Sequence, residues 1–369
     1  MKHYELVQTH DYALRGRYEM TMKDEQGQAL TSGKMHLINT AWGDGFVKTL
    51  AFSGVATPLH LRRHGYVREL FQEALDWGIA QGAIVSVLHP FSFSYSQKFG
   101  YGKVSDHLIV RTPIRMLDFV PRCCNLVKMD STDEGWQEVY KVHNKFCQNR
   151  TLMMLRDDPI FYGKRTVYLY YENGEPTGYI AYSTEKTLHI NHYEDGVMYV
   201  NEIAYLTPQA LNALLGFIRM FEGELDDVEF ANLTMCPEID LLLRHNTHTR
   251  YRLLPDLMVR VLDTEKLFLS HKYPKQPGSF RIHVTDPLPT AGGSFCVEYG
   301  NDKVNVTRLQ EDAQVDLTVD ASTFARLVYG YDTLTPQQAA YMPGLSITGN
   351  ADDFFRAFPK QNAGMFAHF

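Results

Sequence analysis

Apolar and polar positions follow a helical spacing in one stretch of the chain, residues 67–79. Apolar residues recur there every three or four positions, and charged or amide residues fill the positions between them. This spacing predicts a helix with one buried and one solvated face. Apolar segments flank it at residues 55–57 and 84–88. The pattern therefore predicts a strand, a turn, a helix and a second strand within residues 55–102.

The region before this helix follows a different period. Apolar and polar residues alternate over residues 4–57, with turn residues at 24–27 and 44–45, which predicts antiparallel hairpins. A further strand is expected at residues 109–114, and prolines near position 120 end this first unit.

A second unit repeats the order of strand, helix and strand. Its strands are expected at residues 167–171, 178–182 and 228–233, and its helices from Ser131, Thr132 or Asp133 to Phe146 and from Thr207-Pro208 onward. No basic glycine turn precedes the second helix, and proline removes an N–H where an anion would need one. We therefore expect this unit to bind no pyrophosphate.

A third unit begins after a shift in composition near residue 262. Its strands are expected at residues 279–284, 293–299, 303–307, 313–319 and 345–349, and its helices at 321–329, 335–342 and 351–358. A chain of 369 residues is longer than one hydrophobic core usually serves. We therefore expect three domains, residues 1–120, 121–262 and 263–369.

The turn before the first helix has a composition suited to anions. Gly65 allows a tight bend and a close backbone approach, and the first N–H groups of the next helix lack partners within it. Arg62 and Arg63 add positive charge beside those groups. A pyrophosphate would meet both a helix N-terminus and cationic side chains, although an ordinary solvated basic turn has the same composition.

Three motifs together carry a family resemblance. They are Val-Ala-Thr-Pro-x-x-x-Arg-Arg-x-Gly-Tyr-Val from Val55 to Val67, His-Pro-Phe-Ser-Phe from His89 to Phe93, and Phe-Gly-Tyr from Phe99 to Tyr101. With them the chain resembles GNAT-superfamily acetyltransferases and, more narrowly, the Eis-type (enhanced intracellular survival) N-acetyltransferases. The third unit, with its Ser-Ile-Thr-Gly-Asn-Ala-Asp segment from Ser346, is similar to sterol-carrier-protein-like domains.

This resemblance implies the fold class α/β (α+β), with two tandem GNAT-like mixed-sheet domains followed by a sterol-carrier-protein-like α+β domain. It implies acetyl-CoA as the acetyl donor, no metal, and a homo-oligomer, since hexamers occur in the family. In the family a first strand and two helices normally precede the sheet and help shape the acceptor site. No such segment is found before Tyr4, so the first domain is expected to be truncated there.

The resemblance also assigns the cofactor site. The pyrophosphate would lie on the turn and the start of the helix, the pantetheine amides would bond the strand edge at residues 55–57, and the other wall would follow the next strand. The residues expected to bind acetyl-CoA are Val55, Ala56, Thr57, Arg62, Arg63, His64, Gly65, Tyr66, Val67, Arg68, Phe91 and Ser92. Simple strand packing is the alternative explanation for Val55 and Thr57.

Amine acetylation needs a base for the amine and an acid for the departing thiolate. The family's acid is a tyrosine four residues before the glycine of Phe-Gly-Tyr, and this chain has Ser96 there, with Tyr95 as its neighbour. Either a local backbone shift brings the Tyr95 phenol, which protonates a thiolate more readily than the Ser96 alcohol would, to the sulfur, or Tyr95 only packs and the chemistry is weakened. The family's base is the terminal carboxylate, here that of Phe369, and His368 replaces the penultimate acid of the aminoglycoside-modifying members.

Composition narrows the function classes. A net charge of −7 argues against a general nucleic-acid binder, and five cysteines without a Cys-x-x-Cys pair indicate buried free thiols. Neither a signal peptide nor a long apolar segment is present, so we expect a cytoplasmic protein with no membrane contact. Two hypotheses result: an N-acetyltransferase acting on a primary amine of a small or peptide acceptor, or a non-catalytic acetyl-CoA or lipid-binding protein.

Overall fold

The structure is a computed structural model that describes residues 2–129, 133–159, 162–163, 165–188, 194–243, 247–332, 334 and 336–366. Its strands form three sheets with helices against them, which confirms the predicted α+β class. The described chain divides into two compact units, one of residues 2–105 with 256–363 and one of residues 106–255 with 364–366.

The first sheet of the first unit has the strand order β1-β2-β3-β4-β5-β14-β6. Its strands are β1 (His3–Tyr12), β2 (Arg15–Lys23), β3 (Ala29–Trp42), β4 (Gly45–Ala56), β5 (Val85–Leu88), β6 (Gly102–Lys103) and β14 (Met258–Val261). Strands β1 to β4 are successive antiparallel neighbours, as the alternating pattern predicts. The Asp24 carboxylate closes the turn between β2 and β3 by accepting bonds from the amides of Gln26 and Gln28.

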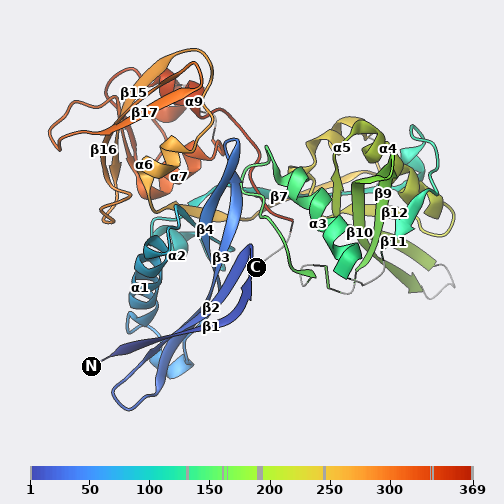
Figure 1. Ribbon diagram of the computed structural model, residues 1–369, viewed down its shortest axis with the longest axis horizontal. Helices are drawn as coiled ribbons and strands as arrows, with labels where there is room; N and C mark the ends of the chain where they lie inside the picture. The colour runs from blue at the N-terminus through green and yellow to red at the C-terminus, as the bar shows by residue number, and fades with distance from the viewer. Residues whose placement is uncertain are drawn as a thin grey trace. The chain divides into compact units, whose positions relative to one another are not determined.

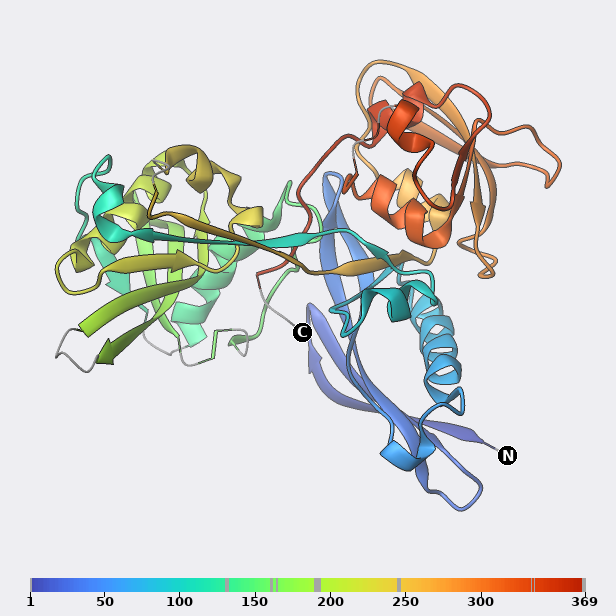
Figure 2. The ribbon, with the colours of Figure 1, turned by 180° about the vertical axis from the view of Figure 1, so that it is seen from behind.

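Helix α1 (Tyr66–Ala80) runs along β1–β4 in both Figures 1 and 2. It buries Leu70, Phe71 and Leu75 among other residues, and Phe71 stacks on Phe52 of β4 with 4.6 Å between ring centroids. Each leucine buried in this way contributes about 2 kcal/mol. A side chain at Gly78 would come within 2.6 Å of Leu50, so the glycine permits close packing of the helix on the sheet.

The strand after residue 105 differs from the prediction. Strand β7 (Asp106–Pro113), which contains most of the strand expected in the first unit, pairs with β12 and β13 in the second sheet. Strand β14, far along the chain, takes the place beside β5 and β6 in the first sheet. The amide of Leu257 donates to the Ser105 hydroxyl and that of Val104 to the Leu257 carbonyl, which extends the pairing of these two segments.

The second unit contains the sheet β13-β7-β12-β11-β10-β9-β8. Its remaining elements are β8 (Leu126–Lys128), α3 (Asp133–Cys147), β9 (Thr166–Glu172), β10 (Glu175–Leu188), β11 (Glu194–Tyr205), α4 (Pro208–Ile218), β12 (Asp227–Phe230), α5 (Pro237–Leu242) and β13 (Arg250–Pro255). These match the predicted order of strand, helix and strand. The helix caps expected at Ser131 and Thr132 lie outside the described residues.

A third sheet, in the first unit, has the order β17-β16-β15-β18-β19. Its elements are α6 (Thr264–Leu269), β15 (Gly278–Thr285), β16 (Gly293–Gly300), β17 (Lys303–Arg308), β18 (Leu317–Asp320), α7 (Ala321–Val328), α8 (Pro336–Ala339), β19 (Leu345–Ile347) and α9 (Asp352–Ala357). The Trp42 indole donates to the Leu267 carbonyl, and the Ser322 hydroxyl to that of Tyr101. These bonds fix the third domain on the first sheet.

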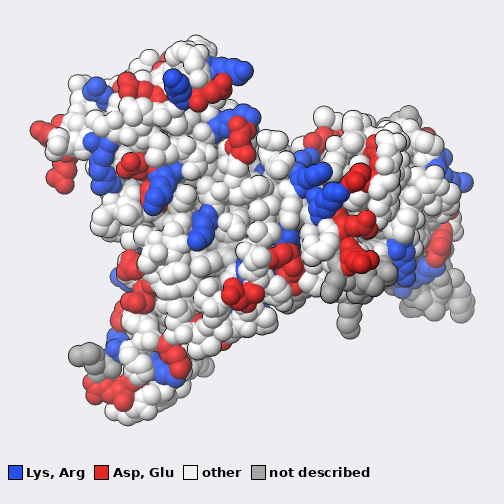
Figure 3. Space-filling view, viewed as in Figure 1, with Lys and Arg blue, Asp and Glu red and all other residues white. Residues whose placement is uncertain are grey.

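For the residues that the structure describes, neither the surface charges nor the cysteines indicate a further functional site. Basic and acidic side chains are interspersed on the face shown in Figure 3. All five cysteines are free; Cys147 and Cys236 are buried, but Cys124 is exposed, so the expectation of uniformly buried thiols is wrong. Among the described residues no helix has the length and apolar character needed to cross a membrane.

Candidate active site

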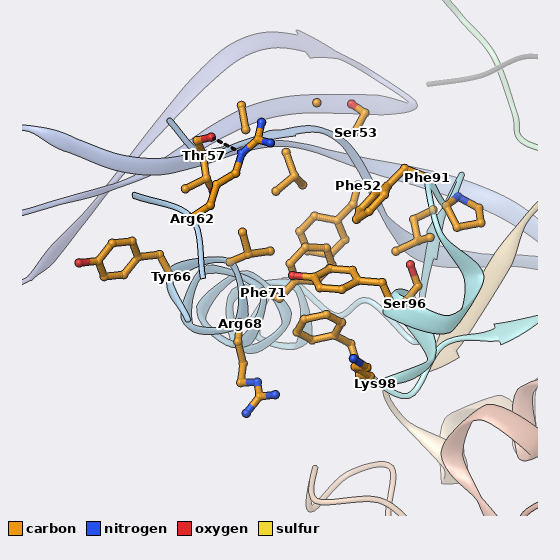
Figure 4. Close-up of a pocket in the computed structure, with 18 of the residues that line it drawn as sticks. Phe52, Ser53, Thr57, Arg62, Tyr66, Arg68, Phe71, Phe91, Ser96 and Lys98 are labelled. Carbon is orange, nitrogen blue, oxygen red and sulfur yellow. Dashed lines mark hydrogen bonds between the residues drawn. The ribbon is translucent and has the colours of Figure 1, made fainter. Parts of the chain in front are cut away.

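A cavity of about 1150 Å³ lies in the first unit between the end of β4, the start of α1 and the segment after β5 (Figure 4). It is lined by Phe52, Ser53, Gly54, Val55, Ala56, Thr57, Leu61, Arg62, Arg63, Gly65, Tyr66, Val67, Arg68, Phe71, Leu88, His89, Pro90, Phe91, Tyr95, Ser96, Lys98 and Phe99. Aromatic and aliphatic side chains dominate this wall, which also includes three arginines.

The cavity lies where strand β5 ends and the parallel strand β4 continues. Strands β4 and β5 pair from Thr49 with Val85 to Phe52 with Leu88, where β5 ends. Strand β4 continues to Ala56, so within the described chain its edge from residue 53 to 56 has no strand beside it on that side. An exposed strand edge presents alternating N–H and C=O groups, which match the amides of an extended ligand such as pantetheine.

The basic turn is held in a bent conformation. Arg62 donates from Nε to the Thr57 carbonyl at 3.3 Å, as Figure 4 shows. Arg63 and Gly65 both have positive φ angles, 68° and 85°, and Gly65 is the N-cap residue of α1. A glycine there avoids the steric cost that other residues incur at positive φ. The chain thus enters α1 with the first amides of the helix at the cavity.

Most residues predicted to bind the cofactor line this cavity. Val55, Ala56, Thr57, Arg62, Arg63, Gly65, Tyr66, Val67, Arg68 and Phe91 all do so. His64 does not: its Nδ1 lies 3.0 Å from the Arg62 carbonyl, and its ring stacks on Tyr66. Ser92 is also not among the lining residues, because its hydroxyl caps helix α2 (Phe93–Gln97) by accepting a bond from the Tyr95 amide.

The two predicted proton donors differ in exposure. Tyr95 lines the cavity, and its ring lies 5.2 Å from those of Phe91 and Phe99. Ser96 also lines the cavity but is only 5% exposed. The phenol of Tyr95 is therefore the more accessible of the two hydroxyls.

Several lining residues were not predicted from the sequence. His89 directly follows β5 and belongs to the His-Pro-Phe-Ser-Phe motif, but it is not among the residues expected in the site. Its Nδ1 lies 3.0 Å from an Asp256 carboxylate oxygen, and Asp256 is 8% exposed. The Ser105 hydroxyl donates to the same carboxylate at 3.4 Å. Asp256 is 167 positions from His89, so no local pattern could reveal the pair.

Ser53 and Lys98 were missed for different reasons. Ser53 precedes the strand residues that the motif contains, and Lys98 lies on the turn after α2. Phe52, Leu61, Phe71 and Phe99 follow the apolar patterns of strand and helix, which indicate only burial. The signal that could have found them is their position directly beside the predicted turn and strand end.

The C-terminal segment is described up to Phe366 and belongs to the second unit. Gly364 donates to the Thr151 carbonyl, and Asn232 donates to that of Met365. Phe366 stacks on Phe146 with 5.6 Å between ring centroids. Phe369 and His368 lie outside the described residues, so the expected base is not located.

The start of helix α4 in the second unit differs from that of α1. Helix α4 begins at Pro208, and its cap Thr207 accepts a bond from the Ala210 amide. The Thr207 hydroxyl in turn donates to the Glu172 carboxylate at 2.5 Å. A carboxylate at this helix N-terminus occupies the position of an anion and would repel a pyrophosphate. No group of three or more potential metal ligands occurs in the part of the chain that the structure describes.

Three family models match the sequence. An acetyltransferase (GNAT) domain matches residues 7–104, a second acetyltransferase (GNAT) domain matches residues 132–261, and a sterol carrier protein domain matches residues 264–365. The resemblance predicted these three domains in this order, and the matches confirm it. Comparison with curated protein sequences gives no match.

Solved structures share the whole fold at low sequence identity. Eis1 from Mycobacterium abscessus is 14% identical with a TM-score of 0.81, and the match covers 100% of both chains. A probable N-acyltransferase from Enterococcus faecalis V583 is 15% identical with a TM-score of 0.80, again over 100% of both. A GCN5-related N-acetyltransferase from Anabaena variabilis ATCC 29413 is 19% identical with a TM-score of 0.80, over 95% of this chain and 89% of that one.

Proposed function

The chain belongs to the GNAT acetyltransferase superfamily, with the domain order of the Eis-type proteins, and from this premise we propose that it transfers an acetyl group from acetyl-CoA to a primary amine. The acceptor is a small molecule or a peptide. The cytoplasmic location and the homo-oligomeric state remain predictions from the sequence.

One observation carries this proposal: the cavity combines a helix N-terminus, three arginines and an open strand edge in a single continuous space. The α1 amides with Arg62 and Arg63 suit the pyrophosphate of CoA, because helix N-termini and guanidinium groups both favour phosphate oxygens. The β4 edge suits the pantetheine amides. The apolar wall of Phe52, Phe91 and Phe99 suits the uncharged thioester.

The reaction is a nucleophilic substitution at the thioester carbonyl. The amine nitrogen bonds the carbonyl carbon, the C–S bond breaks, the amine loses a proton and the CoA thiolate gains one. We assign the second proton to the Tyr95 phenol, which lines the cavity. The first proton is assigned to the Phe369 carboxylate, as the family resemblance implies.

Two measurements together test the proposal. Calorimetry with acetyl-CoA measures binding, and release of the CoA thiol in the presence of polyamines, aminoglycosides and lysine-containing peptides measures turnover. We expect binding and amine-dependent thiol release with at least one acceptor class. Binding without release from any amine would instead support a non-catalytic acetyl-CoA-binding protein, and absence of binding would overturn both hypotheses.

A further inference from the structure

A chain of hydrogen bonds crosses three strands of the first sheet and ends at the cavity. Arg15 on β2 contacts His36 Nδ1 on β3 from Nη2 at 3.1 Å and from Nε at 3.4 Å. His36 Nε2 lies 3.0 Å from the hydroxyl oxygen of Ser53 on β4. Arg15 is 6% exposed and His36 is 1% exposed, whereas Ser53 lines the cavity.

The arginine fixes the direction of every proton in this chain. A guanidinium group only donates, so His36 Nδ1 accepts, and the neutral ring carries its proton on Nε2. Burial, aided by the charge of Arg15, lowers the pKa of His36 to about 3, which keeps the ring neutral. His36 therefore donates to Ser53, and the proton of the Ser53 hydroxyl is left for another acceptor.

This polarity is the reverse of the one that creates a serine nucleophile. In such sites a carboxylate accepts a hydrogen bond from the N–H of one histidine ring nitrogen. The other ring nitrogen faces the serine and takes its proton. Here a cation occupies the place of the carboxylate, so His36 cannot take a proton from Ser53. The hydroxyl serves as a hydrogen-bond donor, strengthened by the bonds behind it.

The position of Ser53 indicates which group it meets. It is the first residue of β4 beyond the last pair with β5, and it lies four residues before Thr57, about 13 Å along an extended strand. In Figure 4 it lies with Phe52 and Phe91 at the end of the cavity away from Tyr66. With the pyrophosphate at the start of α1, the thioester of acetyl-CoA reaches this end.

We propose that the Ser53 hydroxyl stabilises the oxyanion that forms on the thioester carbonyl during acetyl transfer, with His36 and Arg15 as positioning residues. The inference rests on the proposed function and adds a residue to it. As the amine attacks, negative charge develops on the carbonyl oxygen and then returns to expel the thiolate. A fixed donor stabilises that charge more than it stabilises the neutral carbonyl.

The test is the Ser53→Ala variant, measured for turnover and for acetyl-CoA affinity. We expect kcat to fall about 100-fold, as loss of one oxyanion donor does elsewhere, with the dissociation constant of acetyl-CoA changed less than twofold. Ser53→Cys, which replaces the hydroxyl with a weaker donor of similar shape, should give an intermediate rate. Ser279→Ala, an exposed serine in the third domain, is the matched control and should leave both quantities unchanged.

The positioning role of His36 is tested by comparing kcat in two variants. His36→Phe should lower kcat with little change in acceptor KM, whereas His36→Gln, which keeps an N–H donor, should recover part of the rate. A purely structural role would not distinguish these two variants in kcat once the melting temperatures show that both are folded.

The outcomes separate the inference from the proposed function. An active wild-type protein with unchanged kcat in Ser53→Ala overturns the inference alone, as does a loss of acetyl-CoA affinity with kcat intact. A wild-type protein that binds acetyl-CoA but acetylates no amine overturns the proposed function and the inference with it.

Discussion

Individual side chains carry the chemistry proposed for this protein, and three groups of them surround one cavity. The arginines lie at the start of α1, Tyr95 and Ser96 lie on α2, and Ser53 lies on β4. Each group can be changed without removing a large part of the core.

The two arginines of the turn should bind the pyrophosphate. Arg62→Glu and Arg63→Glu each replace a positive charge with a repelling one, so we expect the affinity for acetyl-CoA to fall at least 10-fold, consistent with about 1.5–3 kcal/mol for a charged hydrogen bond. Calorimetry measures the change. Lys303→Glu, an exposed lysine of the third domain, is the control for net charge. Unchanged affinity in both arginine variants would remove the turn from the site.

The identity of the proton donor can be decided by a pair of variants. Tyr95→Phe removes the more accessible hydroxyl, so kcat for thiol release should fall while acetyl-CoA affinity is retained. Ser96→Ala should have a much smaller effect because Ser96 is buried. The reverse order of effects would assign the role to Ser96.

At the scale of the elements, the entry into α1 shows how the backbone, rather than side-chain packing, shapes the site. A side chain added at Gly65 would meet no atom within 4 Å, so its cost would come from the φ angle of 85° alone. Arg63 already incurs such a cost, with a φ of 68°.

Stability and affinity should therefore change in opposite directions at Arg63. Arg63→Gly relieves the positive φ and should raise the melting temperature slightly, since a left-handed residue other than glycine costs about 1 kcal/mol. The same change removes a cation and should weaken acetyl-CoA binding. Gly65→Ala should lower the melting temperature, because it adds a similar free-energy cost at a positive φ. Thermal melting and calorimetry on both variants measure these changes. A melting temperature that shifts equally in Arg63→Gly and Gly65→Ala would contradict the prediction.

The whole molecule should be sensitive to acid because it buries neutral histidines. Burial lowers the pKa of His36 to about 3 and that of His271 to about 4, and it lowers the pKa of the fully buried His143 as well. The unfolded chain binds a proton at each of these residues near pH 6.5, whereas the folded protein does not. Protonation therefore favours the unfolded chain as the pH falls.

For His36 alone, the free energy of unfolding should fall by about 1.4 kcal/mol for each unit of pH between about 6 and 3. Urea unfolding at several pH values measures the slope. The His36→Gln variant has no proton to gain at this position, so its slope should be smaller than that of the wild type. Identical slopes would show that His36 is not excluded from protonation in the folded state.

The Phe369 carboxylate is expected to act as the base, and this role can be tested at the end of the chain. A C-terminal extension of a few residues keeps the phenylalanine but moves the carboxylate, so it should lower kcat and leave acetyl-CoA affinity unchanged. Deleting Phe369 gives a less specific result because it also removes an aromatic ring. Full activity in the extended protein would contradict the assignment.

Local patterns in the sequence were enough to predict the helix and hairpins that surround the cavity. Helical spacing predicted α1 and alternation predicted the hairpins β1 to β4, and the structure contains both. The family resemblance predicted twelve cofactor-binding residues, of which ten line one cavity, and their binding role stays a prediction. These features depend on neighbours within a few positions. The domain boundaries near 120 and 262 remain predictions.

Which distant strands and side chains meet depends on the three-dimensional fold. Strand β7 joins the second sheet and β14 the first, although the sequence predicts the strand at 109–114 in the first unit, because strand pairing depends on backbone groups that every residue carries. His89 meets Asp256 across 167 positions, and the bonds from Arg15 through His36 to Ser53 need three strands in register. Such contacts leave no periodic pattern, since each partner alone has the composition of an ordinary strand or loop.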